Sequence, residues 1–394
     1  MKLLLSAKWK ISICLIVLFL IPGCWSRTEL SDLSFVSGAC IDTLKDEPGI
    51  RLIVEVARVD ILASTVKTDT TAFFTFEQTG KTVFDAIRNV TLESPHKLFW
   101  GHQQMQLITE RIAEEGFVDA ISFFVRDHET SRNVMMAIAE GDVAEFMQAS
   151  TSKEGLPMNG LRTMLKDSSS NGKVIPVEIH DYLRAHTSPG ICFMLPIIGV
   201  KREGTQTHYI VTGTGLFSDD KMVGRLTPDQ TRGIAWLLNK VDSAVLPLNV
   251  TDTAKEKQDE LMVYEVSLEV IKAKSAIKAL GSLKFEVETT LSVSLGEDNF
   301  QETFSESESP ALNRKIEQAI VKLVEQEMQT AIRITKELKT DPAGFGRALY
   351  RQRPEERKQV GESWCEEHYP EIEVAYKTKV DIIGNMMIKD IDSH

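Results

Sequence analysis

A regular alternation in the last third of the chain constrains its fold more than any other feature. Between residues 283 and 295, apolar side chains occupy most odd positions, and charged or small polar side chains occupy most even ones. A strand with this period has one face on a core and the other in water. Residues 266–270 alternate in the same way and predict a partner strand. The apolar positions are Leu283, Phe285, Val287, Leu291, Val293 and Leu295, with Val266, Leu268 and Val270 in the partner.

The segment after this strand has the period of a helix. Over residues 310–338, apolar side chains recur every three to five positions, which predicts one long amphipathic helix. Residues 372–382 alternate again and predict a last strand. A long helix laid across an antiparallel sheet fits this order of elements. The helical stripe consists of Leu312, Ile316, Ile320, Leu323, Met328 and Ala331.

The first half of the chain mixes short strands with helices. With 394 residues, the chain has the length of two to three domains. We therefore predict an α+β fold class, a mixed α/β multi-domain protein whose C-terminal domain combines an antiparallel sheet with a long amphipathic helix. Strands are predicted over residues 35–43, 50–61, 72–77, 104–109 and 134–139, the first two as a hairpin, and helices over 81–94, 110–115 and 117–125.

A polar segment separates this half from the next strands. Residues 150–170 are rich in Ser, Thr, Gly and Asn, and residues 168–173 (SSSNGK) are predicted to form a loop. Just before this segment, Asp142 is predicted to cap a helix. Just after it, residues 177–185 are predicted to be helical.

Strand patterns return at Cys192. They include a turn at residues 219–220, and Thr227 and Pro228 begin a helix as its cap and first residue. The glycines of residues 212–217 (TGTGLF) lie between two strand patterns and do not open a helix. They indicate a bulge or tight bend and not a phosphate-binding loop.

The composition and net charge limit which classes of partner the chain can bind. The chain has 42% hydrophobic and 26% charged residues, a formal net charge of −12 and a pI of about 5.3. This balance allows a buried core, and an acidic chain without a long basic stripe is not expected to bind nucleic acid. The acidic charge itself bears on solubility and says little about the fold.

A search for catalytic and cofactor signatures finds none. The sequence lacks HExxH, GxSxG and GxxxxGK[ST] patterns. His180, Asp181 and His186 fit no strong metal template, so solvated side chains are favoured there. The charged residues 126–132 favour salt bridges or a partner contact over acid–base chemistry. We predict no catalytic residue, no metal site and no cofactor.

The cysteines form no metal or redox pattern. Cys14 and Cys24 lie in or next to an apolar N-terminal run, while Cys40, Cys192 and Cys365 are scattered singles without a CxxC pair. Buried thiols that pack as small hydrophobes are therefore favoured. Spacing alone leaves open whether two of the last three form a disulfide.

The N-terminus has the pattern of an export signal. Lysines at positions 2, 8 and 10 precede an apolar run of 11 residues, 11–21, which is shorter than the roughly 20 residues of a spanning helix. Gly23 and Cys24 follow this run, as at the cleavage site of a bacterial lipoprotein. Ile21 is an accepted variant of the usual leucine, and Pro22 is a less usual residue. The alternatives are a plain secreted protein and a signal anchor with an incidental cysteine.

Five segments in order resemble the C-subunit lipoproteins of the GerA-type nutrient germinant receptors of endospore-forming bacteria, the Ger(x)C family. No single segment is specific, but the five together cover nearly the whole mature chain. They are Gly23-Cys24-Trp25 with Arg27, Glu29 and Leu30; residues 38–42 (GACID); residues 107–133, which end in RDHETSRN; residues 213–237 (GTGLF to AWL); and residues 341–374, which start with DPAGFG.

The resemblance implies a three-domain mixed α/β arrangement and a non-catalytic receptor subunit. Cys24 would carry N-palmitoyl and S-diacylglycerol groups, on the outer face of the spore inner membrane. The partners would be the integral-membrane A and B subunits and the membrane lipid, and the receptor would trigger germination in response to nutrients. The predicted ranges are 1–23 for the signal peptide, 24–190 for an N-terminal domain, 191–250 for a small middle domain and 251–394 for the C-terminal domain.

Four residues are predicted to contact a partner: Trp25, Glu29, Phe345 and Trp364. The alternative is that Trp25 belongs to a linker and that Phe345 and Trp364 are core residues. Two alternative functions would require other features. A solute-binding lipoprotein of a transporter would need two similar lobes around a cleft. A cell-surface hydrolase would need a nucleophile beside a base, and the sequence shows no such pair.

Overall fold

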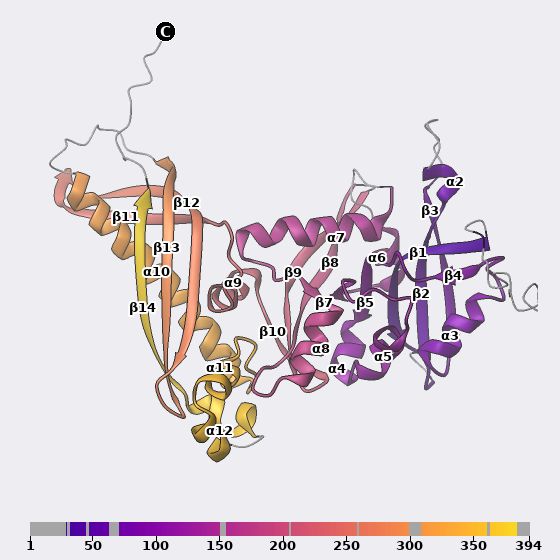
Figure 1. Cartoon of the computed structure of the whole chain (residues 1–394). Helices are drawn as coiled ribbons and strands as arrows, with labels where there is room; N and C mark the ends of the chain where they lie inside the picture. The colour runs from indigo at the N-terminus through magenta and orange to yellow at the C-terminus, as the bar shows by residue number, and fades with distance from the viewer. Residues whose placement is uncertain are drawn as a thin grey trace, which may run out of the picture.

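The chain folds into two β-sheets that lie side by side along an elongated molecule (Figure 1). The computed structural model describes residues 29, 32–44, 47–62, 71–149, 155–204, 206–257, 260–298, 309–360 and 363–383. Within these residues, the strands form a ten-stranded sheet and a four-stranded sheet.

The strands of the large sheet come from the first part of the chain, and those of the small sheet from the last third. They are β1 (Leu33–Thr43), β2 (Ile50–Ala57), β3 (Phe73–Gly80), β4 (Lys97–Phe99), β5 (Met105–Thr109), β6 (Met135–Ala139), β7 (Val177–Glu178), β8 (Met194–Glu203), β9 (Gln206–Ser218) and β10 (Lys221–Leu226), then β11 (Val245–Lys257), β12 (Glu260–Ala279), β13 (Lys284–Asp298) and β14 (Glu373–Ile383).

Helices cover both sheets. They are α2 (Val59–Leu62), α3 (Val83–Val90), α4 (Glu110–Glu115), α5 (Val118–Arg126), α6 (Val143–Gln148), α7 (Pro157–Ser168), α8 (Ile179–Thr187), α9 (Pro228–Leu237), α10 (Ser309–Glu337), α11 (Phe345–Gln352) and α12 (Pro354–Val360). Short helical segments also occur at Ser169–Asn171, Trp364–His368 and Tyr369–Glu371.

The large sheet has a parallel centre and antiparallel edges. Its main path is β10-β9-β8-β6-β5-β1-β2-β3, in which β1, β5, β6 and β8 run parallel. The predicted hairpin of β1 and β2 is confirmed by their antiparallel register. The strand predicted over residues 50–61 ends at Ala57, because the chain turns into α2 there.

Each face of the large sheet is packed under its own helices. One core joins the sheet to α3, α4, α5 and α8, and a second core joins the opposite face to α6 and α7. Successive strand residues contribute to different cores, as Ile41 and Cys40 do. The sheet is therefore the middle layer of three, which explains why its central strands are apolar throughout.

The helix α7 was missed in the polar segment 150–170. Its buried side chains Met158, Leu161 and Leu165 recur at helical spacing between polar residues. Gly38 of β1 allows the close approach, because a Cβ there would lie 2.4 Å from Cγ of Met158. The tertiary contact with β1 therefore stabilises a helix that its composition does not predict. The loop predicted at residues 168–173 is only partly confirmed, because Ser168 ends α7 and Ser169–Asn171 form one short 3-10 helix.

Capping side chains begin the helices where the sequence places them. Asp142 accepts a hydrogen bond from the Glu145 backbone N–H and starts α6. Thr227 and Gln230 form a reciprocal capping box at the start of α9. Such caps pair backbone N–H groups that would otherwise lack a partner in the first turn.

The C-terminal sheet has the order β11-β12-β13-β14, with α10 across one face (Figure 1). The alternation in β13 is confirmed, since Phe285, Val287 and Val293 are buried. The stripe of α10 is buried as predicted, although Val324 is buried instead of Leu323. The last strand differs from the antiparallel expectation, because β14 runs parallel to β13. The long helix carries the chain back along the sheet, so β14 runs in the direction of β13.

The predicted bulge and turn both lie in the β8–β10 strands. The register with β8 shifts at residue 212, next to Gly213, and residues 219 and 220 connect β9 to β10. These strands continue the large sheet as far as Leu226, and the second sheet begins at β11. The domain borders at residues 190 and 250 stay predictions.

Candidate functional site

A buried carboxylate, Asp341, lies where the two halves of the molecule meet. Its side chain is 0% exposed. Oδ1 accepts a hydrogen bond from the Gly344 N–H at 2.7 Å, and Oδ2 accepts from the Gly346 N–H at 2.9 Å and from Nε1 of Trp364 at 2.8 Å. Burial raises the pKa of Asp341 to about 6, while the hydrogen bonds oppose that rise. The carboxylate therefore closes the turn that leads from α10 into α11.

The Asp341 turn is hydrogen-bonded to the large sheet. The backbone oxygen of Asp341 accepts from the Cys192 N–H at 2.9 Å. Thr340 Oγ1 donates to the Phe217 oxygen at 2.7 Å, and the Arg347 N–H donates to the Gly190 oxygen at 2.8 Å. We call residues 340–347, together with Trp364 and the bonded residues Gly190, Cys192 and Phe217, the junction.

The junction requires glycine at position 190. Its φ is +71°, and a Cβ there would lie 2.6 Å from the carbonyl carbon of Gly346. Both the left-handed backbone and the close approach exclude a side chain. The two backbones therefore touch directly at this point.

The predicted partner residues Phe345 and Trp364 lie in the junction and are buried, with exposures of 0% and 4%. The Phe345 ring packs edge-on against Phe285 of β13 at 5.2 Å between centroids. Tyr369 lies against both rings and shares a 2.7 Å hydrogen bond with Thr335 of α10. The burial favours the alternative in which both rings are core residues. A partner contact by either ring stays a prediction.

A second polar contact joins α9 to α10. Arg232 and Glu327 form a double hydrogen-bonded ion pair, and Nε1 of Trp236 donates to Oε2 of Glu327 at 2.8 Å. Arg232 is 7% exposed and Trp236 1% exposed. Trp236 belongs to the predicted segment 213–237, so this segment and the one starting at Asp341 both hold the two halves together.

Two cysteines meet beside the Asp341 turn. Sγ of Cys192 and Sγ of Cys365 lie 2.7 Å apart, and both residues are partly buried. The contact with Cys365 lowers the pKa of Cys192, while the pKa of Cys365 is raised. Cys40 is buried in the core under α7, and burial raises its pKa.

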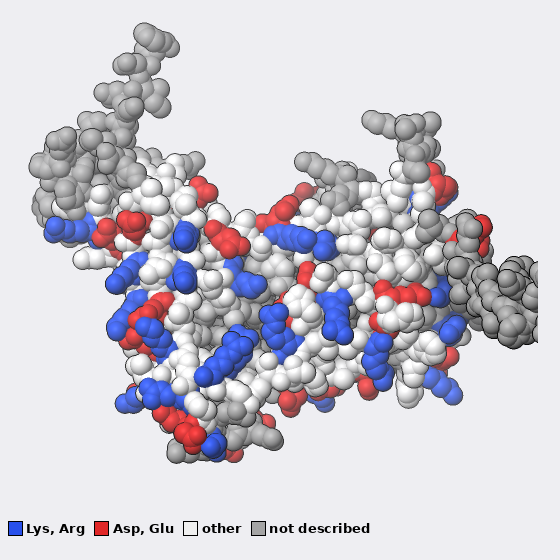
Figure 2. All heavy atoms as spheres, in the orientation of Figure 1, with Lys and Arg blue, Asp and Glu red and all other residues white. Residues whose placement is uncertain are grey.

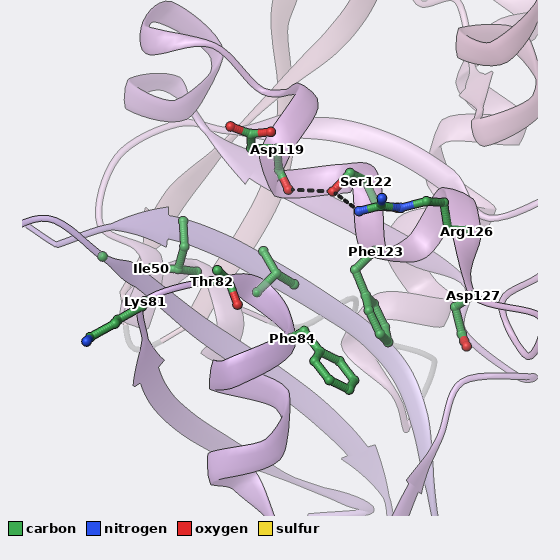
Figure 3. A pocket seen from close by; sticks show the side chains of 11 residues that line it. Ile50, Lys81, Thr82, Phe84, Asp119, Ser122, Phe123, Arg126 and Asp127 are labelled. Carbon is green, nitrogen blue, oxygen red and sulfur yellow. Dashed lines mark hydrogen bonds between the residues drawn. The ribbon is translucent and has the colours of Figure 1, made fainter.

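An open groove lies between α3 and α5 (Figure 3), with a volume of about 810 Å³. Phe84 is 49% exposed there and stacks on Phe123 at 5.6 Å between centroids. The Ser122 hydroxyl donates to the Asp119 backbone oxygen and accepts from Arg126, as the dashed lines in Figure 3 show. Among the described residues that line this groove, no histidine is present to activate Ser122. The groove offers an aromatic surface with charged edges and no nucleophile–base pair.

The remaining candidates lie apart from the junction. Cys24 and Trp25 are outside the described residues, and Glu29 is exposed. His180 contacts the acids Glu178 and Asp181, and across the described ranges no three His, Cys, Asp or Glu side chains gather so as to hold a metal ion. In the charged segment 126–132, Glu129 pairs with Lys97 at 2.5 Å, as the salt-bridge interpretation predicts.

A second buried carboxyl, Glu55 of β2, was not predicted. It is 0% exposed, and its Oε1 accepts from Ser37 Oγ at 2.6 Å and from the Met158 N–H at 3.3 Å. Glu55 thus supplies an acceptor to the first turn of α7, whose own cap residue Leu156 has no side-chain hydrogen bond. Its Oε2 has no partner among the described residues, and burial raises its pKa to about 7.

Glu55→Gln is expected to remove a pH dependence of stability. The folded-state pKa of about 7 lies above the ordinary 4.5, so the folded state favours the protonated carboxyl. That stabilisation is complete below pH 4.5 and is lost as the pH rises through 7. We expect Glu55→Gln to nearly match the wild type at pH 4.5 and to exceed its free energy of unfolding by about 3 kcal/mol at pH 8. Urea unfolding of both proteins at both pH values measures this effect. The same stability difference between variant and wild type at pH 4.5 and pH 8 would contradict it.

Comparison with known proteins shows the family to which the chain belongs. Residues 26–200 match the family model described as the spore germination protein N-terminal domain. Residues 212–386 match the one described as the spore germination B3/GerAC-like C-terminal domain. The chain belongs to this GerAC family of spore germination proteins, as the five motifs predicted.

Individual relatives resemble the chain over nearly its full length. It is 24% identical over 390 residues to spore germination protein KC of Bacillus subtilis (strain 168), covering 93% of each chain. It is 24% identical over 387 residues to spore germination protein B3 of the same organism, covering 95% of this chain and 97% of that one. The crystal structure of the GerBC protein matches with a TM-score of 0.54 at 20% identity, over 88% of this chain and 97% of that chain. This likeness confirms the predicted α+β fold class.

Proposed function

We propose that this chain is the lipid-anchored, non-catalytic subunit of a spore nutrient germinant receptor. Membership of the spore germination family supports the germination role. The residue pattern at Cys24 supports the anchor. The proposal that the subunit is non-catalytic is supported by Asp341, the carboxylate of the last family segment. Both of its oxygens accept hydrogen bonds, from three donors at the place where the two halves meet.

The anchor would act from a membrane surface, on the outer face of the spore inner membrane. Two acyl chains on one residue suffice for stable attachment, because each buried methylene contributes about 0.8 kcal/mol. Of the helices in the described part, none has the length and apolar character to cross a bilayer. The proposed partners are integral-membrane A and B subunits, and the chain would pass the nutrient signal to them by contact.

The length of the tether orients the protein. Cys24 lies eight residues before Asp32. An extended chain spans about 3.5 Å per residue, so Asp32 would lie within roughly 28 Å of the anchored sulfur. The start of β1 and the neighbouring β4 would therefore face the membrane, with the C-terminal sheet at the far end of the molecule (Figure 1).

Four of the exposed apolar side chains belong to segments near the start of β1, while others, such as Ile271 and Leu280, lie on or beside the C-terminal sheet. The register brings the end of β2 and the start of β3 beside the start of β1, and the Leu92 turn leads into β4. On the face in Figure 2, by comparison, basic and acidic side chains lie close together over both halves. Apolar residues at a water–lipid boundary fit a bilayer surface better than bulk solvent. The exposed residues are Val59, Leu62, Phe74 and Leu92.

The alternative, a solute-binding lipoprotein, gains no support from the fold. Such a protein would pair two similar lobes around a cleft. Here a ten-stranded three-layer sheet stands beside a four-stranded sheet covered by one long helix, among the residues that the structure describes. Calorimetry of the purified chain with a panel of amino acids and sugars separates the two functions, since one-to-one binding would favour the alternative.

Replacing Cys24 with alanine tests the anchor. We expect Cys24→Ala to shift the chain out of the spore membrane fraction by at least about tenfold, because without the thiol no diacylglycerol is attached and most of the membrane affinity is lost. The nutrient response should fall in parallel. Immunoblots of membrane and soluble fractions measure the first effect, and the fall in optical density after nutrient addition measures the second. Ser26→Ala is the matched control. Wild-type membrane content and response in Cys24→Ala spores would exclude the anchor.

A further inference from the structure

Two thiols that are far apart in the sequence are brought into contact at the junction. Cys192 precedes β8 of the large sheet, and Cys365 lies in the short helix Trp364–His368, 173 residues later. Their Sγ atoms are 2.7 Å apart, closer than unbonded sulfur atoms ordinarily pack. The fold alone therefore places them near bonding distance, since a disulfide holds its sulfurs about 2.05 Å apart.

Both cysteines are positioned by the same carboxyl residue. The Cys192 N–H donates to the Asp341 backbone oxygen at 2.9 Å. Trp364, the neighbour of Cys365, donates its indole N–H to Oδ2 of Asp341 at 2.8 Å. These hydrogen bonds fix the backbone beside each thiol, so the contact between the thiols is part of the folded junction.

Small reagents have access to this pair. A pocket of about 380 Å³ is lined by both cysteines together with His186, Ser363 and Trp364. Cys40, by contrast, is 0% exposed and lies in the core under α7. Oxidation is therefore expected at Cys192 and Cys365, with Cys40 as an internal control in the same chain.

We propose that Cys192 and Cys365 form a disulfide in the native protein, which fastens the large sheet to the C-terminal domain. The oxidant would be a disulfide, either of a small thiol or of an exchange protein. The Cys192 thiolate attacks it and releases one thiol, and the Cys365 thiolate then attacks the mixed disulfide and releases the second. Two protein thiols and one external disulfide thus become one protein disulfide and two external thiols. The reaction rests on the proposed function to the extent that export takes the chain to an oxidising compartment.

Mass spectrometry of the full chain from spores tests the link. The protein is alkylated with iodoacetamide without reductant and digested. We expect the Cys192 and Cys365 peptides joined as one ion, which reductant separates, and Cys40 alkylated after unfolding. Recovery of Cys192 and Cys365 as alkylated peptides from unreduced protein would overturn the proposal. The same digest reports whether the Cys24 peptide carries lipid, so failure of the link and failure of the anchor are distinguished.

A thermal measurement gives an independent readout. Closing a loop of this length restricts the unfolded chain, so reduction with dithiothreitol should lower the Tm of the wild type by roughly 10 °C. Cys192→Ser should show no change on reduction, whereas Cys40→Ala should keep the full shift. An equal Tm for oxidised and reduced wild-type protein would count against the disulfide without requiring any variant to fold.

Discussion

Asp341→Ala is expected to lower the free energy of unfolding by about 4 kcal/mol at pH 7, the largest effect of any single polar replacement considered for this chain. The substitution leaves the N–H groups of Gly344 and Gly346 and the indole N–H of Trp364 without an acceptor. Each buried donor without a partner costs about 1–3 kcal/mol. Urea unfolding of the purified chain, followed by tryptophan fluorescence, measures the loss.

An exposed aspartate provides the control for this experiment. Asp229 of α9 is 74% exposed and pairs with Lys173 at the surface. Asp229→Ala should cost less than about 1 kcal/mol, because exposed ion pairs contribute little. Equal midpoints for Asp341→Ala and Asp229→Ala would show that the junction does not depend on the buried carboxylate.

Glu327→Ala is expected to cause the second-largest loss of stability, about 3 kcal/mol. The substitution leaves the Arg232 guanidinium, 7% exposed, and the Trp236 indole N–H without their shared acceptor between α9 and α10. Removing one member of a buried ion pair costs about 3–5 kcal/mol, because the other charge stays buried without a partner. If water reaches Arg232, 1 M salt should reduce the loss caused by Glu327→Ala more than it reduces the loss caused by Asp341→Ala.

The same helix offers a matched control for Glu327. Glu337 of α10 pairs with Arg333 one turn away at 2.8 Å, and both side chains are more than 60% exposed. Such a surface pair contributes about 0.3–0.5 kcal/mol. Urea unfolding of Glu327→Ala and Glu337→Ala therefore isolates the α9–α10 contact. Similar losses in the two variants would contradict a structural role for Glu327.

Local periodicity predicted the elements that lie on one core. The alternation of Phe285, Val287 and Val293 places β13 with one face inward, and the apolar stripe predicts α10 almost to its ends. Thr227 and Pro228 mark the start of α9 because the cap and the first turn depend on neighbouring residues only. These features depend on neighbouring residues only, so they can be predicted from a single sequence.

Elements that depend on distant partners were not predictable in this way. α7 lies in a polar segment, and its Met158 contacts Gly38 and Glu55. Both residues lie more than a hundred positions earlier in the chain. The parallel pairing of β14 depends on where α10 delivers the chain, which periodicity does not report.

The candidate site shows the same division. The motif beginning at Asp341 was visible in the sequence, but its donor Trp364 lies 23 residues away, so its role needed the fold. Phe345 and Trp364 were predicted as partner contacts because exposed and buried aromatic residues look alike in a sequence. The pairing of Cys192 with Cys365 had no signal at all in their spacing.

We propose that this chain serves the nutrient response of the spore as a receptor subunit. The most direct measurement is the germination of spores that lack it, after addition of a nutrient panel and, separately, of a trigger that bypasses nutrient receptors. We expect the response to at least one nutrient to be lost while the bypass trigger works at the wild-type rate. A wild-type response to every nutrient that the parent spores respond to would contradict the account.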